Sequence, residues 1–159
     1  MQYKIRKTNK EEEELKRKAA VEAQNSRAQL LIKQPFIGIL AMRMELTPVV
    51  DFRMPTASTN GSTIFINPEY FFLLNIQQRI YLMAHEIWHC IFLHFKRKGN
   101  RDHEKFNYAA DLEVDFMLQE QNIEPDFILP HESGWRGLSA ESIYERLDEN
   151  KKRPEYSDV

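Results

Sequence analysis

The chain has 159 residues, of which 42% are hydrophobic and 29% charged, and its formal net charge is -2. These values fit one soluble, helix-rich domain with tails and exclude fibrous and disordered proteins. Because basic and acidic residues nearly balance, we expect no general attraction to nucleic acid or anionic membranes. Without an apolar run of membrane-spanning length, and with Cys90 as the single cysteine, a cytoplasmic protein is expected.

The first predicted helix begins near Asn9. Thr8 and Glu11 have the spacing of a capping box, and the following acidic run suits the positive end of a helix dipole. The helix is expected to end at about Lys33, because the residue before Pro35 is pushed out of helical geometry.

Pro35 suits the first turn of a second helix, FIGILAMRMEL, with a stop at residues 47–48. After it the hydrophobic period changes. Residues 49–54 and 62–67 are short runs rich in strand-forming residues, and Asn60-Gly61 between them is a favoured hairpin turn. We therefore predict two strands of a small sheet.

The second half of the chain is predicted to be helical. Asn67 and Pro68 have the pattern of a helix start, with asparagine as cap and proline at the first position. A long helix should follow and end before Gly99. The helices predicted here cover residues 69–74, 76–98, 105–121 and 139–147.

The long helix carries AHEIWHCIFLH, which places polar groups in an otherwise apolar run. Each helical residue advances by about 100°, so His85, Glu86 and His89 share roughly one quadrant of a buried helix. Histidines at i and i+4 can bind one Zn²⁺ ion, and Glu86 can act as general base on a metal-activated water. Composition alone would produce about 0.02 such HExxH matches in this chain.

A third ligand is expected from the next helix. Counting back along it from the turn brings Asp111 to the level of His89, and the two alanines before it allow close approach. Asp115, one turn further, could orient His85, whereas Glu113 points away. His94 would face away from the site if its helix continues, which leaves it as an outer partner or an ordinary histidine.

The group that stabilises the oxyanion besides the metal is not fixed by the pattern. Tyr108, Tyr144 and His131 are candidates, although each also fits a structural role. A substrate could add as a strand to the sheet edge near residues 49–59 or 62–67.

The chain also resembles a family of bacterial and phage zincin-like metallopeptidases over about residues 35 to 147. The resemblance implies a zincin-like α+β fold with a small sheet packed on the active-site helix. It assigns metal binding to His85, His89 and Asp111 and the base role to Glu86. Family members often carry a von Willebrand factor A-like domain downstream, which we expect to be absent here. The stretches that carry the resemblance are MPTASTNGSTIFINPEYFFLL, LMAHEIWHCIFLH, FNYAADLEVDFML and ILPHESGWRGLSAESIYERL.

Together these features predict a zinc-dependent metallopeptidase with one Zn²⁺ per chain and a protein or peptide substrate. We expect a helix over residues 1–34, the zincin-like domain over 35–149 and a flexible tail over 150–159. The alternative is a catalytically silent zincin-like module that binds metal and acts in protein interaction or regulation. Nucleic acid is not an expected partner, because the basic residues within 96–101 suit a helix C-terminus. The oligomeric state is not predicted.

Overall fold

A cap at Asn9 sets the start of the N-terminal helix. The computed structural model describes residues 6–124, 129–132 and 134–147. In it, α1 (Lys10–Lys33) follows Asn9, whose side chain accepts a hydrogen bond from the Glu12 N–H while the Glu12 carboxylate accepts one from the Asn9 N–H. The helix has the predicted extent, but the box is not Thr8 with Glu11. Consecutive glutamates allow either register, and asparagine takes the capping position.

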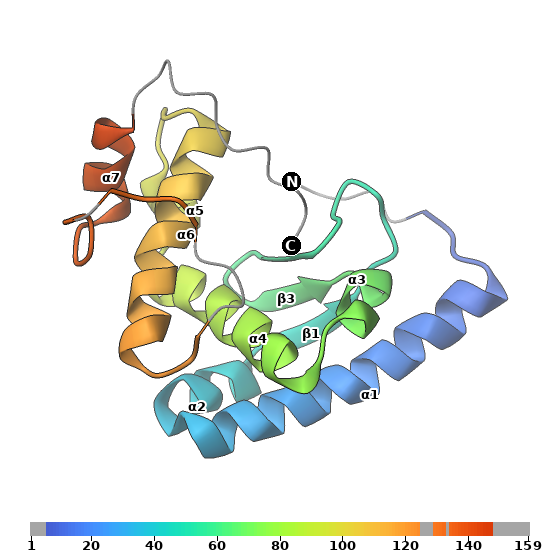
Figure 1. Ribbon diagram of the computed structural model, residues 1–159. Helices are drawn as coiled ribbons and strands as arrows, with labels where there is room; N and C mark the ends of the chain where they lie inside the picture. Colours follow the sequence, from blue (N-terminus) through green and yellow to red (C-terminus); the bar gives the residue numbers. More distant parts are fainter. Residues whose placement is uncertain (1–5, 125–128, 133, 148–159) are drawn as a thin grey trace.

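The second helix, α2 (Pro35–Arg43), folds back along α1 (Figure 1). A Cβ atom at Gly38 would lie 2.3 Å from Leu31 Cα, so glycine permits direct contact between the two backbones. The helix ends earlier than predicted, because Glu45 and Leu46 belong to a strand. Pairing with a neighbouring strand therefore overrides their helical pattern.

The sheet has three short strands in the order β1-β3-β2. β1 (Glu45–Pro48) pairs in parallel with β3 (Thr63–Ile66), and β2 (Ala57–Thr59) pairs antiparallel with β3. The central position of β3 leaves β1 and β2 as the two edges.

The predicted strand over residues 49–54 is wrong. There the Asp51 carboxylate accepts a hydrogen bond from the Arg53 N–H at 2.9 Å and pairs with the Arg53 guanidinium, which closes a turn. The strand lies instead at β2, within the predicted connection. The prediction over 62–67 is confirmed by β3, and Gly61, at φ 96°, makes the hairpin turn as expected.

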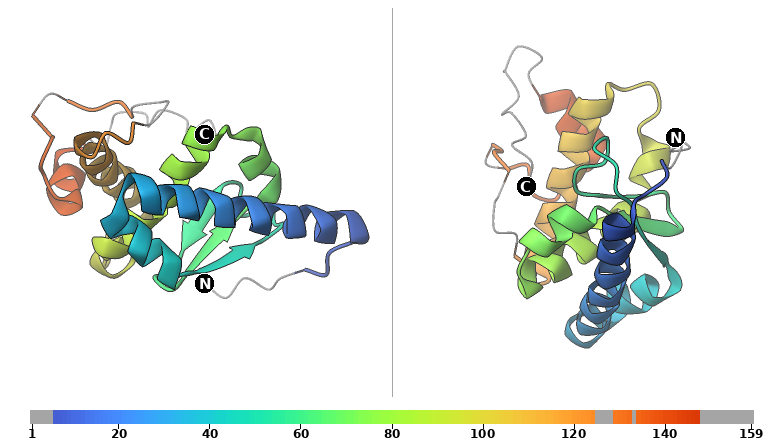
Figure 2. Two further views of the ribbon diagram at one scale, coloured as in Figure 1. Left: turned by 90° about the horizontal axis from the view of Figure 1, so that it is seen from below. Right: turned by 90° about the vertical axis from the view of Figure 1, so that its right-hand side faces the viewer.

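One face of the sheet forms the main core. Ile64 and Ile66 are buried, whereas Phe65 between them is only partly buried, as strand alternation requires. They belong to one buried cluster with Leu30 of α1 and Ile87 of α4 (Ile76–Ile91). Seen from below, α1 runs across the sheet (Figure 2, left). This arrangement of helices on a small sheet confirms the predicted α+β class.

The other helices follow in chain order. α3 (Pro68–Leu73) is capped by Asn67, as predicted. The long helix predicted over 76–98 is wrong as a single element, since α4 ends at Ile91 and a short α5 (His94–Arg97) follows. The last two predicted helices are confirmed as α6 (His103–Glu120) and α7 (Ala140–Arg146), which pack on each other around a second buried cluster.

Within the described residues, no helix is long and apolar enough to cross a membrane. The division into units over 1–34 and 35–149 stays a prediction, although Ala23 and Leu30 of α1 share the core cluster with α4. The tail predicted over 150–159 lies outside the described residues.

Candidate metal centre

The centre lies where α4 and α6 meet. α4 begins at an Asn75 cap and buries Ile80, Met83 and Ile87 in the main core. On α6, Ala109 and Ala110 are almost fully buried, which allows the close approach predicted from their size. The HExxH residues and Asp111 are thereby brought onto facing sides of two packed helices.

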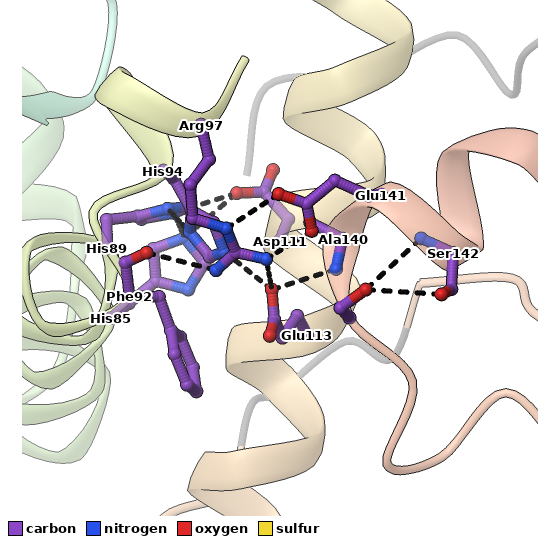
Figure 3. Close-up of polar contacts among 11 residues, drawn as sticks. His85, His89, Phe92, His94, Arg97, Asp111, Glu113, Ala140, Glu141 and Ser142 are labelled. Atoms are coloured by element: carbon purple, nitrogen blue, oxygen red, sulfur yellow. Dashed lines mark hydrogen bonds and ion pairs between the residues drawn. The ribbon is translucent and has the colours of Figure 1, made fainter.

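Three side-chain atoms form a small triangle between these helices. His85 Nε2 and His89 Nε2 are 2.9 Å apart, and they lie 3.2 Å and 3.0 Å from Asp111 Oδ1. Figure 3 shows the two imidazoles and the carboxylate pointing toward one another. The structure thus brings together the three residues predicted as metal ligands.

The triangle has the size and chemistry of a divalent-metal site. Tetrahedral zinc holds nitrogen and oxygen ligands at about 2.0–2.1 Å, which separates the ligand atoms by about 3.3 Å. The observed separations are only slightly shorter. In the described part of the chain, this group contains His85, His89 and Asp111 and no fourth side chain of its kind. Three protein ligands leave one tetrahedral position for water or substrate, as in catalytic sites.

The outer nitrogen of His85 is held by partners that fit a metal ligand. His85 Nδ1 lies 3.6 Å from Asp115 Oδ1 and 3.4 Å from the Tyr81 hydroxyl, which donates a hydrogen bond to the Asp115 carboxylate. An acceptor at Nδ1 keeps the proton there and leaves Nε2 available for a metal. Asp115 therefore lies where it was expected.

The charges in the triangle favour a bound cation. Burial alone would raise the pKa of Asp111, but hydrogen bonds from His85 and His89 hold it well below its ordinary value. Burial opposes charging of His85, yet the contacts with Asp111 and Asp115 raise its pKa well above the ordinary value. A positive charge is thus strongly stabilised here, and a divalent ion can supply it in place of a proton.

Glu86 is a buried carboxylate beside this triangle. Only 7% of its surface is exposed, and its pKa is raised by burial and lowered in part by the nearby His89 and His85. No hydrogen bond from any described residue contributes to this balance. A carboxylate with a raised pKa and no donor among the described residues is suited to exchange protons with water.

The structure corrects the expectation that His94 faces away. α4 ends at Ile91, and Leu93 adopts a left-handed conformation with φ 55°. This turn directs the His94 side chain back toward α4, so that His94 Nδ1 lies 2.8 Å from His89 Nδ1. No glycine occurs between the two histidines, and Leu93 makes the turn. His94 still contacts the outer nitrogen of His89, as one of its predicted alternatives allows.

The left-handed turn at Leu93 can be tested by stability. Leu93→Val should have a free energy of unfolding about 1 kcal/mol lower than Leu93→Gly, because a branched Cβ clashes with the following carbonyl in this conformation. Urea denaturation measures the difference. Val21 is exposed inside α1, where glycine is the poorer helix former. The Val21→Gly variant should therefore be less stable than the wild-type protein, which has valine there. The same order at both positions would contradict the turn.

Glu113 points away from Asp111, as expected, and contacts His94. Its Oε2 atom lies 2.7 Å from His94 Nε2 and accepts hydrogen bonds from Arg97 and from the Ala140 N–H (Figure 3). The helical wheel correctly separated it from Asp111 but could not place His94 beside it.

The three oxyanion candidates make structural contacts. The Tyr108 hydroxyl donates to the Pro130 carbonyl, and the Tyr144 hydroxyl accepts from the Asp102 N–H at 3.1 Å. His131 is exposed, lies 2.9 Å from the Leu129 carbonyl and packs against a phenylalanine ring. None of these contacts involves the metal triangle, so a structural role explains the position of each of the three side chains.

Residues 18–158 match the sequence model of a family described as "Putative metallopeptidase domain". The chain belongs to this family. The match runs from α1 to beyond α7 and includes the whole triangle, which confirms the family expected from the motifs. No curated protein and no solved structure matches the chain.

Two sets of contacts around the centre of this metallopeptidase-domain protein were not predicted from its sequence. Tyr81 lies one helical turn before His85 on the same face, so its spacing could have revealed it. The contacts of Arg97 with Glu113 and Glu141 depend on the turn at Leu93 and on the placement of α7, for which the sequence carries no comparable signal.

Proposed function

We propose that the protein is a zinc-dependent peptidase. The observation that carries this proposal is the triangle of His85, His89 and Asp111 with the buried Glu86 beside it. Two imidazoles and one carboxylate form a donor set that zinc accepts, with one position left open. Membership of the metallopeptidase-domain family supports the same reaction class.

In this proposal His85, His89 and Asp111 hold the ion, and Glu86 moves the proton. A zinc ion supplies Lewis acidity for the peptide carbonyl and lowers the pKa of water to about 7. Glu86 takes a proton from the attacking water on a carboxylate oxygen. As the carbon–nitrogen bond breaks, Glu86 returns that proton to the leaving amide nitrogen. Asp115 and Tyr81 keep the His85 ring in orientation throughout.

We further propose that the substrate binds as an extended strand along β2. Of the two candidate edges, residues 62–67 contain β3, which has a strand on each side and cannot pair with a substrate. Residues 49–59 contain β2, which is an edge strand beside α4. β2 lies against the active helix, where Thr59 Oγ1 is 3.2 Å from Cys90 Sγ. Main-chain hydrogen bonds to this edge would hold a peptide without demanding a particular sequence.

The alternative of a catalytically silent metal-binding module is less well supported. A structural zinc site closes its coordination with a fourth protein ligand, whereas the group described here has three. A module without catalysis also has no use for a buried carboxylate beside the ion, and burying Glu86 costs stability.

Removal and return of metal tests the proposal. Protein treated with a chelator should lose hydrolysis of a quenched fluorescent peptide library, and one equivalent of Zn²⁺ should restore it. The expected stoichiometry is one zinc per chain. Activity that survives complete removal of metal, or zinc-loaded protein that cleaves nothing while the Glu86→Gln variant behaves identically, would contradict a peptidase.

A further inference from the structure

A continuous line of polar contacts leads outward from the second histidine of the centre. His89 Nδ1 is 2.8 Å from His94 Nδ1, and His94 Nε2 is 2.7 Å from Glu113 Oε2. Figure 3 shows these three side chains in sequence between α4, α5 and α6. His94 is 4% exposed, so water does not compete freely for either ring nitrogen.

The chemistry of a metal ligand fixes the direction of these hydrogen bonds. If His89 binds the ion through Nε2, its proton is on Nδ1, and this N–H must donate. His94 Nδ1 is then the acceptor, which places the proton of His94 on Nε2, where it donates to the Glu113 carboxylate. Each ring nitrogen in the line is then either a donor or an acceptor, and a neutral His94 can make both of its hydrogen bonds.

Glu113 is itself fixed from the opposite side. Its Oε2 atom accepts from Arg97 Nη2 at 3.2 Å and from the Ala140 N–H, the first residue of α7, at 2.9 Å. Arg97 is in turn paired with Glu141 of α7. The contacts to His89 are therefore anchored on two further helices rather than on a mobile surface group.

We propose that His94 and Glu113 are positioning residues that orient the His89 ring and strengthen it as a metal ligand. This inference rests on the proposed metal function of the triangle. His94 is not itself a ligand, because its near nitrogen faces Nδ1 of His89 and not the triangle. Loss of such an outer partner typically weakens metal binding about 10- to 100-fold.

Three variants separate orientation from packing. His94→Leu fills the site but offers no acceptor, and should weaken Zn²⁺ binding about 10- to 100-fold in competition with a chromophoric chelator. His94→Asn places its Oδ1 atom where the Nδ1 atom stood but cannot reach Glu113. It should therefore bind Zn²⁺ less tightly than wild type but more tightly than His94→Leu, even though it leaves a larger cavity. Glu113→Gln preserves the shape of the side chain but removes its charge, and should weaken Zn²⁺ binding about tenfold.

Each variant is also unfolded thermally with chelator present, and Co²⁺ spectra are recorded. His103→Asn, at an exposed position on α6, is the control and should bind zinc as wild type does. A purely structural His94 would make affinity follow the metal-free stability, with His94→Asn no tighter than His94→Leu, and this would overturn the inference. A Co²⁺ spectrum of lower coordination in both His94 variants would make His94 a ligand and overturn it as well.

The two proposals fail in different ways. Wild-type protein that binds no Zn²⁺ would remove both the metal centre and the positioning role. Wild-type protein that binds Zn²⁺ tightly, with His94→Leu and Glu113→Gln unchanged, would remove only the positioning role and leave the proposed function intact.

Discussion

Glu86→Gln should lower kcat/KM for peptide hydrolysis by at least about a hundredfold, the contribution typical of a general base. Zinc content should stay close to one per chain, because Glu86 is not part of the ligand triangle. Glutamine has the shape of glutamate but cannot accept and return a proton at neutral pH. Activity is measured on a fluorescent peptide library and zinc by elemental analysis of the same samples.

A matched control for this variant is Glu120→Gln, at an exposed position near the end of α6. It makes the same chemical change away from the centre and should leave kcat/KM and zinc content unchanged. If Glu86→Gln retained wild-type activity, the proton would have to move through another group. If it lost both zinc and activity, Glu86 would be a ligand and not a base.

Asp111→Ala should weaken Zn²⁺ binding by more than about a hundredfold, because it removes one of three protein ligands rather than an outer partner. Asp111→Asn keeps the volume of the side chain, replaces the charged ligand by a weak neutral one and should behave similarly. Affinity is measured by competition with a chromophoric chelator, and Co²⁺ spectra report the change in coordination.

Asp115→Asn provides the graded comparison on the same helix. Asp115 Oδ1 lies 3.6 Å from the outer nitrogen of His85, Nδ1, and does not belong to the triangle. Loss of its charge should therefore weaken Zn²⁺ binding about 10- to 100-fold. Unchanged zinc affinity in Asp111→Ala would contradict the ligand assignment. A larger loss in Asp115→Asn than in Asp111→Ala would exchange the roles of the two carboxylates.

The centre was largely predictable because its residues lie on two regular helices. Helical geometry alone places His85 and His89 on one face, and the rise per residue brings Asp111 level with His89. The same counting placed Asp115 beside His85. His85 and His89 lie on one regular helix, and Asp111 and Asp115 lie on another. The count from His89 to Asp111 reached the right residue although it assumed a helix that continues to residue 98, whereas α4 ends at Ile91 and α5 follows.

The failures occur where one residue leaves regular geometry. A helix assumed to continue through Leu93 directs His94 away from the centre, whereas the left-handed turn brings it to His89. Leucine rarely adopts this conformation, so nothing in its identity indicates the turn. Glu113 was correctly directed away from Asp111, but its contact with His94 could not be predicted for the same reason.

The sheet was predicted less well than the helices. Residues 49–54 have the composition of a strand, but Asp51 bonds to Arg53 and closes a turn. Glu45 and Leu46 read as helix because their neighbours do, yet they pair with β3. Strands this short depend on partners distant in sequence, and local patterns do not report those partners.

The most direct measurement of the central claim is anomalous diffraction at the zinc edge from crystals of the zinc-loaded protein. The proposal requires one peak per chain, about 2.0–2.2 Å from His85 Nε2, His89 Nε2 and an Asp111 oxygen, with no protein atom in the fourth position. A peak at another site, or a fourth protein ligand that closes the coordination, would contradict a catalytic zinc centre.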